Sequence, residues 1–323
     1  MINKYVLCSL IGLTTNVVMA NEISYVKSDN NFQFTEYSLK SNSVKDAYLD
    51  YFISKPESAG SFPIVILVGG STDKEHLDSI IGFQKYFKSE LNTNHLGTLA
   101  VDKIGINNQV VNKDLTMQHY TRTQILNDYQ QVISYVKNNP PKGWNGKFAI
   151  LGVSEGGPIA EKLAEQNKDI QAVAIWSGAI DSSWRDTLWL DMHKIYNEVC
   201  VPQNNPISDC LDVASKDRFE SRINYIESNP SYESSFFNMT NMYVADGVNF
   251  PRPDYSKLAN RNVLVVTGVE DTIINSSDEF DKKAKDNKVK IDYWRVDGMD
   301  HMIRKRPDLI ANTFVWLRDK LSK

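Results

Sequence analysis

This sequence of 323 residues contains few cysteines and few histidines and has little excess of either charge, and each of these features argues against a class of protein. The formal net charge is only -4, so the chain lacks the basic surface that nucleic acid or an anionic membrane would require. Beyond the first twenty residues, no apolar run is long enough to span a membrane. No segment repeats at a fixed period and none is of low complexity, which excludes repeat architectures.

The few histidines also limit the cofactors that the chain could hold. There are five, and four of them (His76, His95, His119 and His193) show no metal-ligand spacing with acidic partners. We therefore expect no metal ion, and we expect no organic cofactor.

The first twenty residues have the pattern of a secretory signal peptide. Lys4 supplies a positive start, residues 5–13 form an apolar core, and Val18-Met19-Ala20 offers small residues at the cleavage positions. We expect cleavage before Asn21, which would leave a secreted or periplasmic protein without a stable membrane span. The alternative is an uncleaved N-terminal anchor.

Removal of residues 1–20, which include Cys8, leaves only Cys200 and Cys210. An even pair of cysteines ten positions apart in an exported chain predicts one disulfide that closes a short loop. Two free buried thiols are the alternative.

Buried apolar runs alternate with helical patterns along most of the chain. The expected strands are Phe32–Leu39, Ala47–Ile53, Pro63–Val68, Thr98–Val101, Phe148–Leu151, Ala172–Trp176, Val263–Val266 and Val289–Val296. The expected helices are 76–91, Thr121–Asn138, a helix that ends near Gln166, and Leu309–Leu321. This alternation predicts an α/β fold, in which helices flank a mostly parallel sheet, with residues 21–323 forming a single domain.

One segment, at about residues 178–260, interrupts the alternation and has no clear buried strand. Helical patterns occur near Trp184–Glu198 and Ser215–Glu227, and the segment is rich in aromatic residues and methionine. Because it follows the end of a strand, we expect a helical cap over the ligand-binding edge of the sheet. Its aromatic side chains could line a substrate pocket or form the core of the cap, and both interpretations remain open.

The sequence Gly152-Val-Ser154-Glu-Gly156 lies between an expected strand and an expected helix. A sharp strand-to-helix turn of this kind exposes the serine hydroxyl and needs small neighbours. Ser154 is therefore the predicted nucleophile. An ordinary glycine-rich turn is the alternative.

A serine nucleophile needs a base and an acid that orients the base, and later turns provide candidates for both. His301 follows the strand that ends at Val296, and Asp271 follows the strand at Val263–Val266. We predict that His301 is the base and Asp271 the acid. The other carboxylates considered for the acid are Glu270, Asp297, Asp300 and Asp181.

Backbone N–H groups must stabilise the negative charge that develops on the substrate carbonyl oxygen. The N–H of Glu155 is one expected donor, and the turn Gly69-Gly70-Ser71 supplies the other, from Gly70 or Ser71. The Glu155 side chain could interact with the helix N-terminus or tune the site, and we assign it no catalytic role.

The order Ser154, Asp271, His301 resembles that of the α/β-hydrolases, and the resemblance covers nearly all of the chain after residue 20. The turn Asp102-Lys-Ile-Gly105 also looks like one that these proteins often carry. The Gly-Gly-Ser and Gly-Val-Ser-Glu-Gly-Gly motifs are similar to those of dienelactone-hydrolase-like proteins and of the C-terminal domain of acyl-CoA thioesterases and bile-acid acyltransferases. Val68 stands where many lipases and esterases have histidine.

The resemblance implies the α/β-hydrolase fold and a serine–histidine–aspartate triad, but it does not name the substrate. The predicted function is a serine hydrolase that cleaves an ester or thioester of a small acyl substrate through an acyl-enzyme. A peptidase that uses the same triad is one alternative. The other is a non-catalytic protein of this fold that binds a ligand under the cap.

Overall fold

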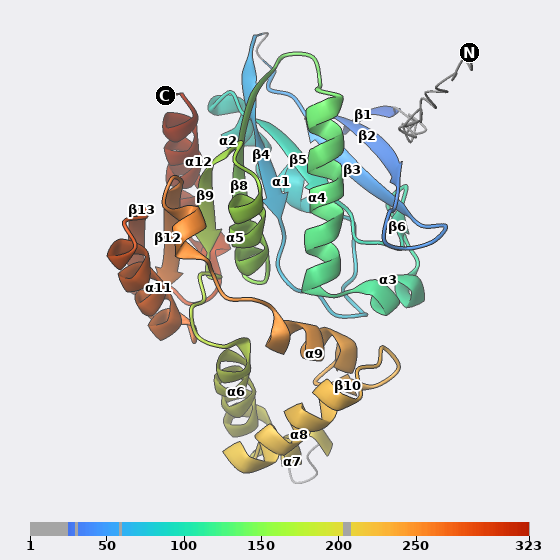
Figure 1. Ribbon diagram of the computed structural model, residues 1–323, viewed down its shortest axis with the longest axis vertical. Coiled ribbons are helices and arrows are strands. Elements are labelled where there is room, and N and C mark those ends of the chain that lie inside the picture. Colours follow the sequence, from blue (N-terminus) through green and yellow to red (C-terminus); the bar gives the residue numbers. More distant parts are fainter. Residues whose placement is uncertain (1–24, 30–31, 58–59, 203–207, 323) are drawn as a thin grey trace, which may run out of the picture.

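The computed structural model describes residues 25–29, 32–57, 60–202 and 208–322 (Figure 1). The predicted signal peptide, residues 1–20, lies outside the described residues. Within the described ranges, no helix is both long and apolar enough to cross a membrane.

A mostly parallel sheet forms the centre of the molecule, with nine strands among the described residues in the order β1-β2-β3-β5-β4-β8-β9-β12-β13. The antiparallel strands at one edge are β1 (Tyr25–Asp29), β2 (Phe32–Lys40) and β3 (Tyr48–Ser54). The parallel strands are β5 (Gly97–Val101), β4 (Phe62–Val68), β8 (Trp144–Val153), β9 (Ile170–Trp176), β12 (Asn262–Gly268) and β13 (Lys290–Val296). This arrangement confirms the predicted fold class.

The apolar runs are continuous because both faces of the parallel sheet are covered. In β4, Ile64 and Ile66 pack into the core on one face, while Val65 and Leu67 pack into the core on the other. Helices α4 (Arg122–Asn138), α5 (Gly156–Gln166) and α11 (Ile274–Asp286) cover the first face, and α1 (Ile81–Tyr86), α2 (Lys88–Thr93) and α12 (Pro307–Leu321) cover the second (Figure 1).

The single helix expected over residues 76–91 is instead the two short helices α1 and α2, so this prediction was wrong. The buried carboxylate of Asp102 accepts hydrogen bonds from the Ser79 hydroxyl at 2.8 Å and from the Ile80 N–H at 2.6 Å. These bonds fix the chain before residue 81, where α1 begins. At Phe87 the backbone leaves the helical region, with φ -96° and ψ 12°, and separates the two helices.

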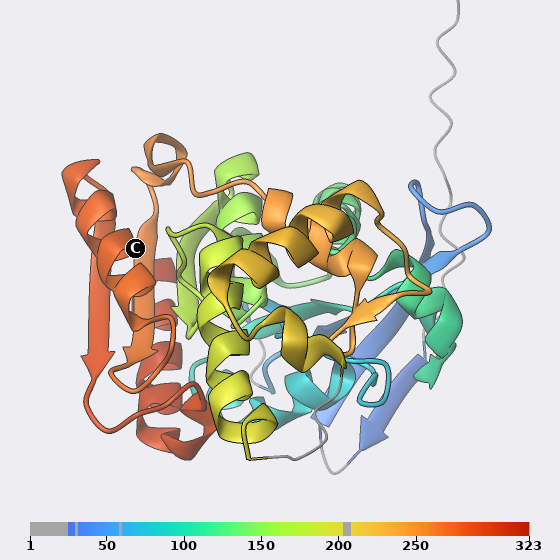
Figure 2. The ribbon, with the colours of Figure 1, turned by 90° about the horizontal axis from the view of Figure 1, so that it is seen from below.

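The described residues between β9 and β12 (178–202 and 208–260), which we call the cap segment, form a layer of helices at the edge of the sheet where the parallel strands end (Figures 1 and 2). Its helices are α6 (Trp184–Ile195), a π-helical turn (Tyr196–Cys200), α7 (Ser208–Asp212), α8 (Lys216–Ser228), α9 (Asn241–Asn249) and α10 (Tyr255–Leu258). A small hairpin, β10 (Ser235–Phe236) and β11 (Met239–Thr240), precedes α9.

Local sequence explains where the cap helices begin. The side chains of Ser183, Ser215 and Thr240 each accept a hydrogen bond from a backbone N–H in the first turn of α6, α8 and α9. A disulfide joins Cys200, at the end of the π-helical turn, to Cys210 in α7.

The aromatic residues of the cap segment occupy different environments. Phe219 and Phe236 are fully buried and form part of its apolar core. Tyr232, in contrast, is 42% exposed and lines a cavity between the cap and the sheet domain.

A short helix, α3 (Lys113–His119), follows the strand pair β6 (Ile106–Asn107) and β7 (Val110–Val111) and leads into α4.

Candidate active site

Ser154 lies in the turn between β8 and α5 and has a left-handed backbone, with φ +52°. This conformation is uncommon for a residue other than glycine and stores strain of about 1–3 kcal/mol. The turn is tied to the sheet because the Ser154 N–H donates to the Trp176 carbonyl at 2.8 Å. A Cβ at Gly156 would lie 2.3 Å from the Val68 carbonyl oxygen, and one at Gly152 would lie 2.3 Å from the Gly156 carbonyl oxygen. Both positions therefore require glycine.

The three residues predicted to form a triad are in contact. The Ser154 hydroxyl lies 2.9 Å from Nε2 of His301. The Nδ1 atom of the same ring lies 3.0 and 3.1 Å from the two carboxylate oxygens of Asp271. With a proton on Nδ1, the ring donates to Asp271 and its Nε2 can accept the serine proton. This is the arrangement needed for nucleophilic catalysis by serine.

Burial differs across the three residues in a way that suits their chemistry. The Asp271 side chain is 0% exposed, whereas the His301 side chain is 44% exposed. The Asp271 carboxylate is therefore held away from water, while the imidazole remains accessible to solvent. Asp271 also accepts the Ile273 N–H at 3.3 Å, which helps to fix the carboxylate.

The other acidic candidates lie in different environments. Glu270 and Asp297 are exposed. Asp300 accepts the Met302 N–H at 2.8 Å and pairs with the Lys305 ammonium. Asp181 is bound by the Lys283 ammonium and the Tyr255 hydroxyl. Of the five candidates, only Asp271 is hydrogen-bonded to His301.

Carboxylates also set the charge of the imidazole. The hydrogen bond to Asp271 is the main cause that raises the pKa of His301 above its ordinary value of 6.5, and the charges of Asp271, Asp191 and Asp300 act in the same direction. Asp191 belongs to α6 of the cap, and burial raises its own pKa. Sequence reasoning missed Asp191 because nothing in the pattern of α6 indicates which residue faces the triad.

The predicted oxyanion donors lie on both sides of Ser154. A Cβ at Gly70 would lie 3.4 Å from the Cβ of Ser154, so this turn is directly beside Ser154. Within the described part of the chain, the backbone N–H groups of Gly70, Ser71 and Glu155 donate to no protein acceptor. Free N–H groups at this place are available to a negatively charged oxygen.

The Glu155 side chain points into a buried polar cluster that the sequence did not predict. Its Oε2 accepts the Tyr120 hydroxyl at 2.7 Å, and its Oε1 lies 3.7 Å from Nε of Arg122. The Arg122 and Glu155 side chains are only 4% and 2% exposed. The Lys103 ammonium lies 5.2 Å from the centre of the Tyr120 ring, and burial lowers the pKa of Lys103.

These partners of Glu155 come from distant parts of the chain. Tyr120 and Arg122 flank Thr121, the residue that caps α4, and Lys103 lies two positions after the end of β5. The one signal available in the sequence was Lys103 itself, a charged residue at the carboxyl end of a buried strand, where ligand sites occur in such sheets.

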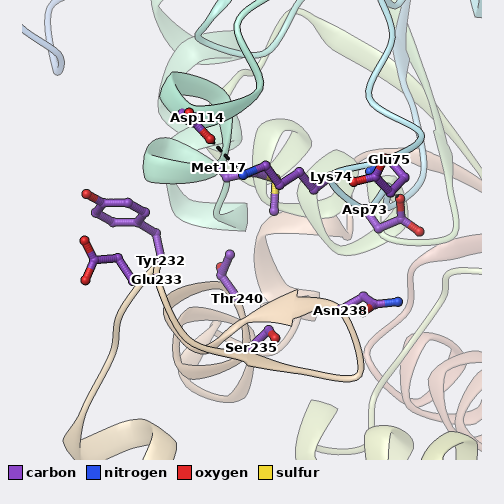
Figure 3. A pocket seen from close by; sticks show the side chains of 10 residues that line it. All are labelled: Asp73, Lys74, Glu75, Asp114, Met117, Tyr232, Glu233, Ser235, Asn238 and Thr240. Atoms are coloured by element: carbon purple, nitrogen blue, oxygen red, sulfur yellow. Dashed lines mark hydrogen bonds and ion pairs between the residues drawn. The ribbon is translucent and has the colours of Figure 1, made fainter.

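A cavity of about 480 Å³ lies between the cap and the sheet domain (Figure 3). It is lined on one side by the loop that continues from the oxyanion turn and by α3, and on the other by the β10–β11 hairpin and the chain before it. The lining residues are Asp73, Lys74, Glu75, Asp114, Met117, Tyr232, Glu233, Ser235, Asn238 and Thr240. Across its wall, the Lys74 ammonium is 2.7 Å from the Asp114 carboxylate. None of the three triad residues lines this cavity.

No protein-family profile matches the sequence, and no curated protein matches it significantly. Solved structures do match the fold. A carboxyl esterase from Bacillus coagulans is 13% identical with a TM-score of 0.60, and the match covers 90% of this chain and 98% of the esterase. A lipase in an open form is 15% identical with a TM-score of 0.60, covering 90% and 98%. The proline iminopeptidase of Mycobacterium smegmatis is 13% identical with a TM-score of 0.57, covering 89% and 99%.

The chain has the α/β-hydrolase fold. At these identities the likeness establishes the fold and not the activity. In the α/β-hydrolase fold, the nucleophile, the acid and the histidine follow in that chain order. Ser154, Asp271 and His301 follow β8, β12 and β13 in the same order.

Proposed function

We propose that this protein is a serine hydrolase that cleaves an ester or thioester of a small acyl substrate through an acyl-enzyme. The observation that carries the proposal is the hydrogen-bonded series Ser154–His301–Asp271 at the ligand-binding edge of an α/β-hydrolase sheet. The fold is also that of a carboxyl esterase and a lipase, which supports the ester class.

In the proposed reaction, Oγ of Ser154 attacks the substrate carbonyl carbon while its proton passes to Nε2 of His301. The carbonyl oxygen becomes negatively charged and accepts the N–H of Glu155 and an N–H of Gly70 or Ser71. The imidazolium then protonates the leaving alcohol or thiol as its bond to the carbonyl carbon breaks. A water molecule then attacks the acyl-enzyme through the same proton transfers, which releases the acid and restores the serine.

Replacement of the nucleophile tests the proposal. Ser154→Ala should abolish hydrolysis of p-nitrophenyl acetate and butyrate, because it removes the hydroxyl that would form the acyl-enzyme. Ser221→Ala is a matched control, since Ser221 is an exposed serine on α8 that donates only to the Asp217 carbonyl. A Ser154→Ala protein that hydrolyses both esters at the parent rate would refute the mechanism.

A secreted or periplasmic location belongs to the same proposal. The signal-like pattern of residues 1–20 and the Cys200–Cys210 disulfide both support export, because disulfides persist in oxidising compartments. N-terminal sequencing of the mature protein should begin at Asn21, and a chain that begins at Met1 would contradict the proposed cleavage.

A peptidase is the second candidate, and Asp191 favours it. A carboxylate in α6 that acts electrostatically on His301 could bind the ammonium group of a peptide N-terminus close to the triad. One protein of similar fold is a proline iminopeptidase. Turnover of prolyl and other aminoacyl amides would favour this function, with a KM that rises in Asp191→Asn. Turnover of neutral esters alone would exclude it.

A further inference from the structure

The two segments that supply the oxyanion donors lie far apart in the chain, and a series of hydrogen bonds through side chains connects them. Glu155 supplies an N–H directly after the nucleophile, and Thr72 directly follows the turn Gly69-Gly70-Ser71. The Thr72 N–H donates to the Tyr120 hydroxyl at 2.9 Å, and that hydroxyl donates to the Glu155 carboxylate at 2.7 Å. The glutamate that contributes a backbone donor therefore also holds, through Tyr120, the loop that contributes the second donor.

The direction of these hydrogen bonds is fixed by the groups involved. A backbone N–H can only donate and a carboxylate can only accept, so the hydroxyl must accept from Thr72 and donate to Glu155. Burial and the neighbouring Glu155 charge raise the pKa of Tyr120 well above its ordinary value, which keeps the proton on the hydroxyl. The Tyr120 hydroxyl can therefore donate to Glu155 while it accepts from Thr72.

Positive side chains compensate the buried carboxylate. Arg122 forms an ion pair with Glu155, and Lys103 lies over the Tyr120 ring. A buried carboxylate without such partners would be strongly destabilised. The cluster can therefore keep the Glu155 carboxylate charged next to the nucleophile. A charged carboxylate accepts a stronger hydrogen bond from the Tyr120 hydroxyl than a neutral acceptor would.

The cap segment packs against the same cluster. Tyr243 of α9 stacks on Tyr120, with ring centres 5.0 Å apart and planes inclined by 30°. The Arg122 guanidinium lies 4.3 Å from the centre of the Trp184 ring in α6. The cap therefore restrains the two side chains that bind Glu155.

We infer that the Glu155 side chain and Tyr120 are positioning groups, which fix the loop Gly69–Thr72 against the nucleophile turn so that both oxyanion donors address one oxygen atom. The inference rests on the proposed function and adds a role for the Glu155 side chain that the triad does not require. Neither side chain needs to touch the substrate.

The test is Tyr120→Phe, which removes the hydroxyl and keeps the ring that stacks on Tyr243. Tyr255→Phe is the matched control, because the buried Tyr255 also donates to a buried carboxylate, Asp181 at 3.0 Å, but contacts neither the triad nor the oxyanion turn. Misplacement of an oxyanion donor should lower kcat by about 10- to 100-fold in Tyr120→Phe. KM should stay within about twofold, since the donors act mainly in the transition state, and the control should retain the parent kcat.

Amide hydrogen exchange gives a second readout that needs no activity. The Thr72 amide should exchange faster in Tyr120→Phe than in the parent, and the control should leave it unchanged. A parent protein that hydrolyses no ester or amide would refute the proposed function, while the exchange at Thr72 would still decide whether Tyr120 holds the loop. Parent-like exchange at Thr72, or a parent-like kcat in an active enzyme, would overturn the inference.

Discussion

Replacement of Asp271 by asparagine tests the part of the triad that depends most on electrostatics. The substitution keeps the size of the side chain but removes the charge next to Nδ1 of His301, which lies 3.0 and 3.1 Å from the two carboxylate oxygens. In the proposed reaction the imidazole becomes positive, so the carboxylate should stabilise the transition state more than the ground state.

The expected loss can be estimated from the geometry. At an effective dielectric constant of about 20, two unit charges roughly 4 Å apart attract by about 4 kcal/mol. That energy corresponds to about a thousandfold in rate. Because the imidazole is 44% exposed and water screens part of the attraction, we expect kcat to fall by roughly a hundredfold to a thousandfold.

The assay is steady-state hydrolysis of p-nitrophenyl butyrate by the parent and by Asp271→Asn, with thermal unfolding to show that both are folded. Asp300→Asn serves as the control, because Asp300 is adjacent to His301 in sequence but binds Lys305 and the Met302 N–H. The reasoning is refuted if folded Asp271→Asn keeps a kcat within about threefold of the parent, or if Asp300→Asn causes the larger loss.

Three further predictions follow from the same structure. His301 must be neutral to accept the serine proton and its pKa is raised, so activity should fall as the pH drops through a value above 6.5. Asp191→Asn removes one charge that raises this pKa, so the acidic limb of the pH–rate profile should move to lower pH. The double variant Cys200→Ser/Cys210→Ser, which opens a loop of sequence separation 10, should lose about 2–3 kcal/mol of unfolding free energy in urea titrations, and an unchanged midpoint would contradict this. Gly156→Ala should abolish ester hydrolysis and lower Tm, because its Cβ would lie 2.3 Å from the Val68 carbonyl oxygen, whereas Gly82→Ala has no atom within 4 Å of the new Cβ and should retain both activity and Tm.

The sheet and the positions of Ser154, Asp271 and His301 could be predicted because they depend on local patterns. Each residue follows a continuous apolar run, and such runs become strands covered on both faces. Parallel strands end at one edge, so residues that follow them meet even when 147 positions separate Ser154 from His301. The helix expected over residues 76–91 was wrong because a distant residue, Asp102, fixes the chain before α1.

The neighbours of Glu155, and the cap residues that face the triad and the cavity, could not be predicted because they depend on packing between distant segments. Tyr120 reaches Glu155 across 35 positions, and Tyr243 joins them only when α9 packs against α4. The composition of the cap likewise did not distinguish Phe219, which is buried in its core, from Tyr232, which lines the cavity. Asp191 is one of several polar residues on α6, and only the folded arrangement brings its charge close enough to act on His301.

The most direct test of the central claim is to react the folded protein with a fluorophosphonate and map the modified peptide by mass spectrometry. An activated serine beside a histidine should be labelled once per chain, at Ser154, and the labelling should slow strongly in His301→Ala. Stoichiometric labelling at Ser154 is the predicted result. A folded protein that takes up no label, or takes it up at another residue, would contradict the account.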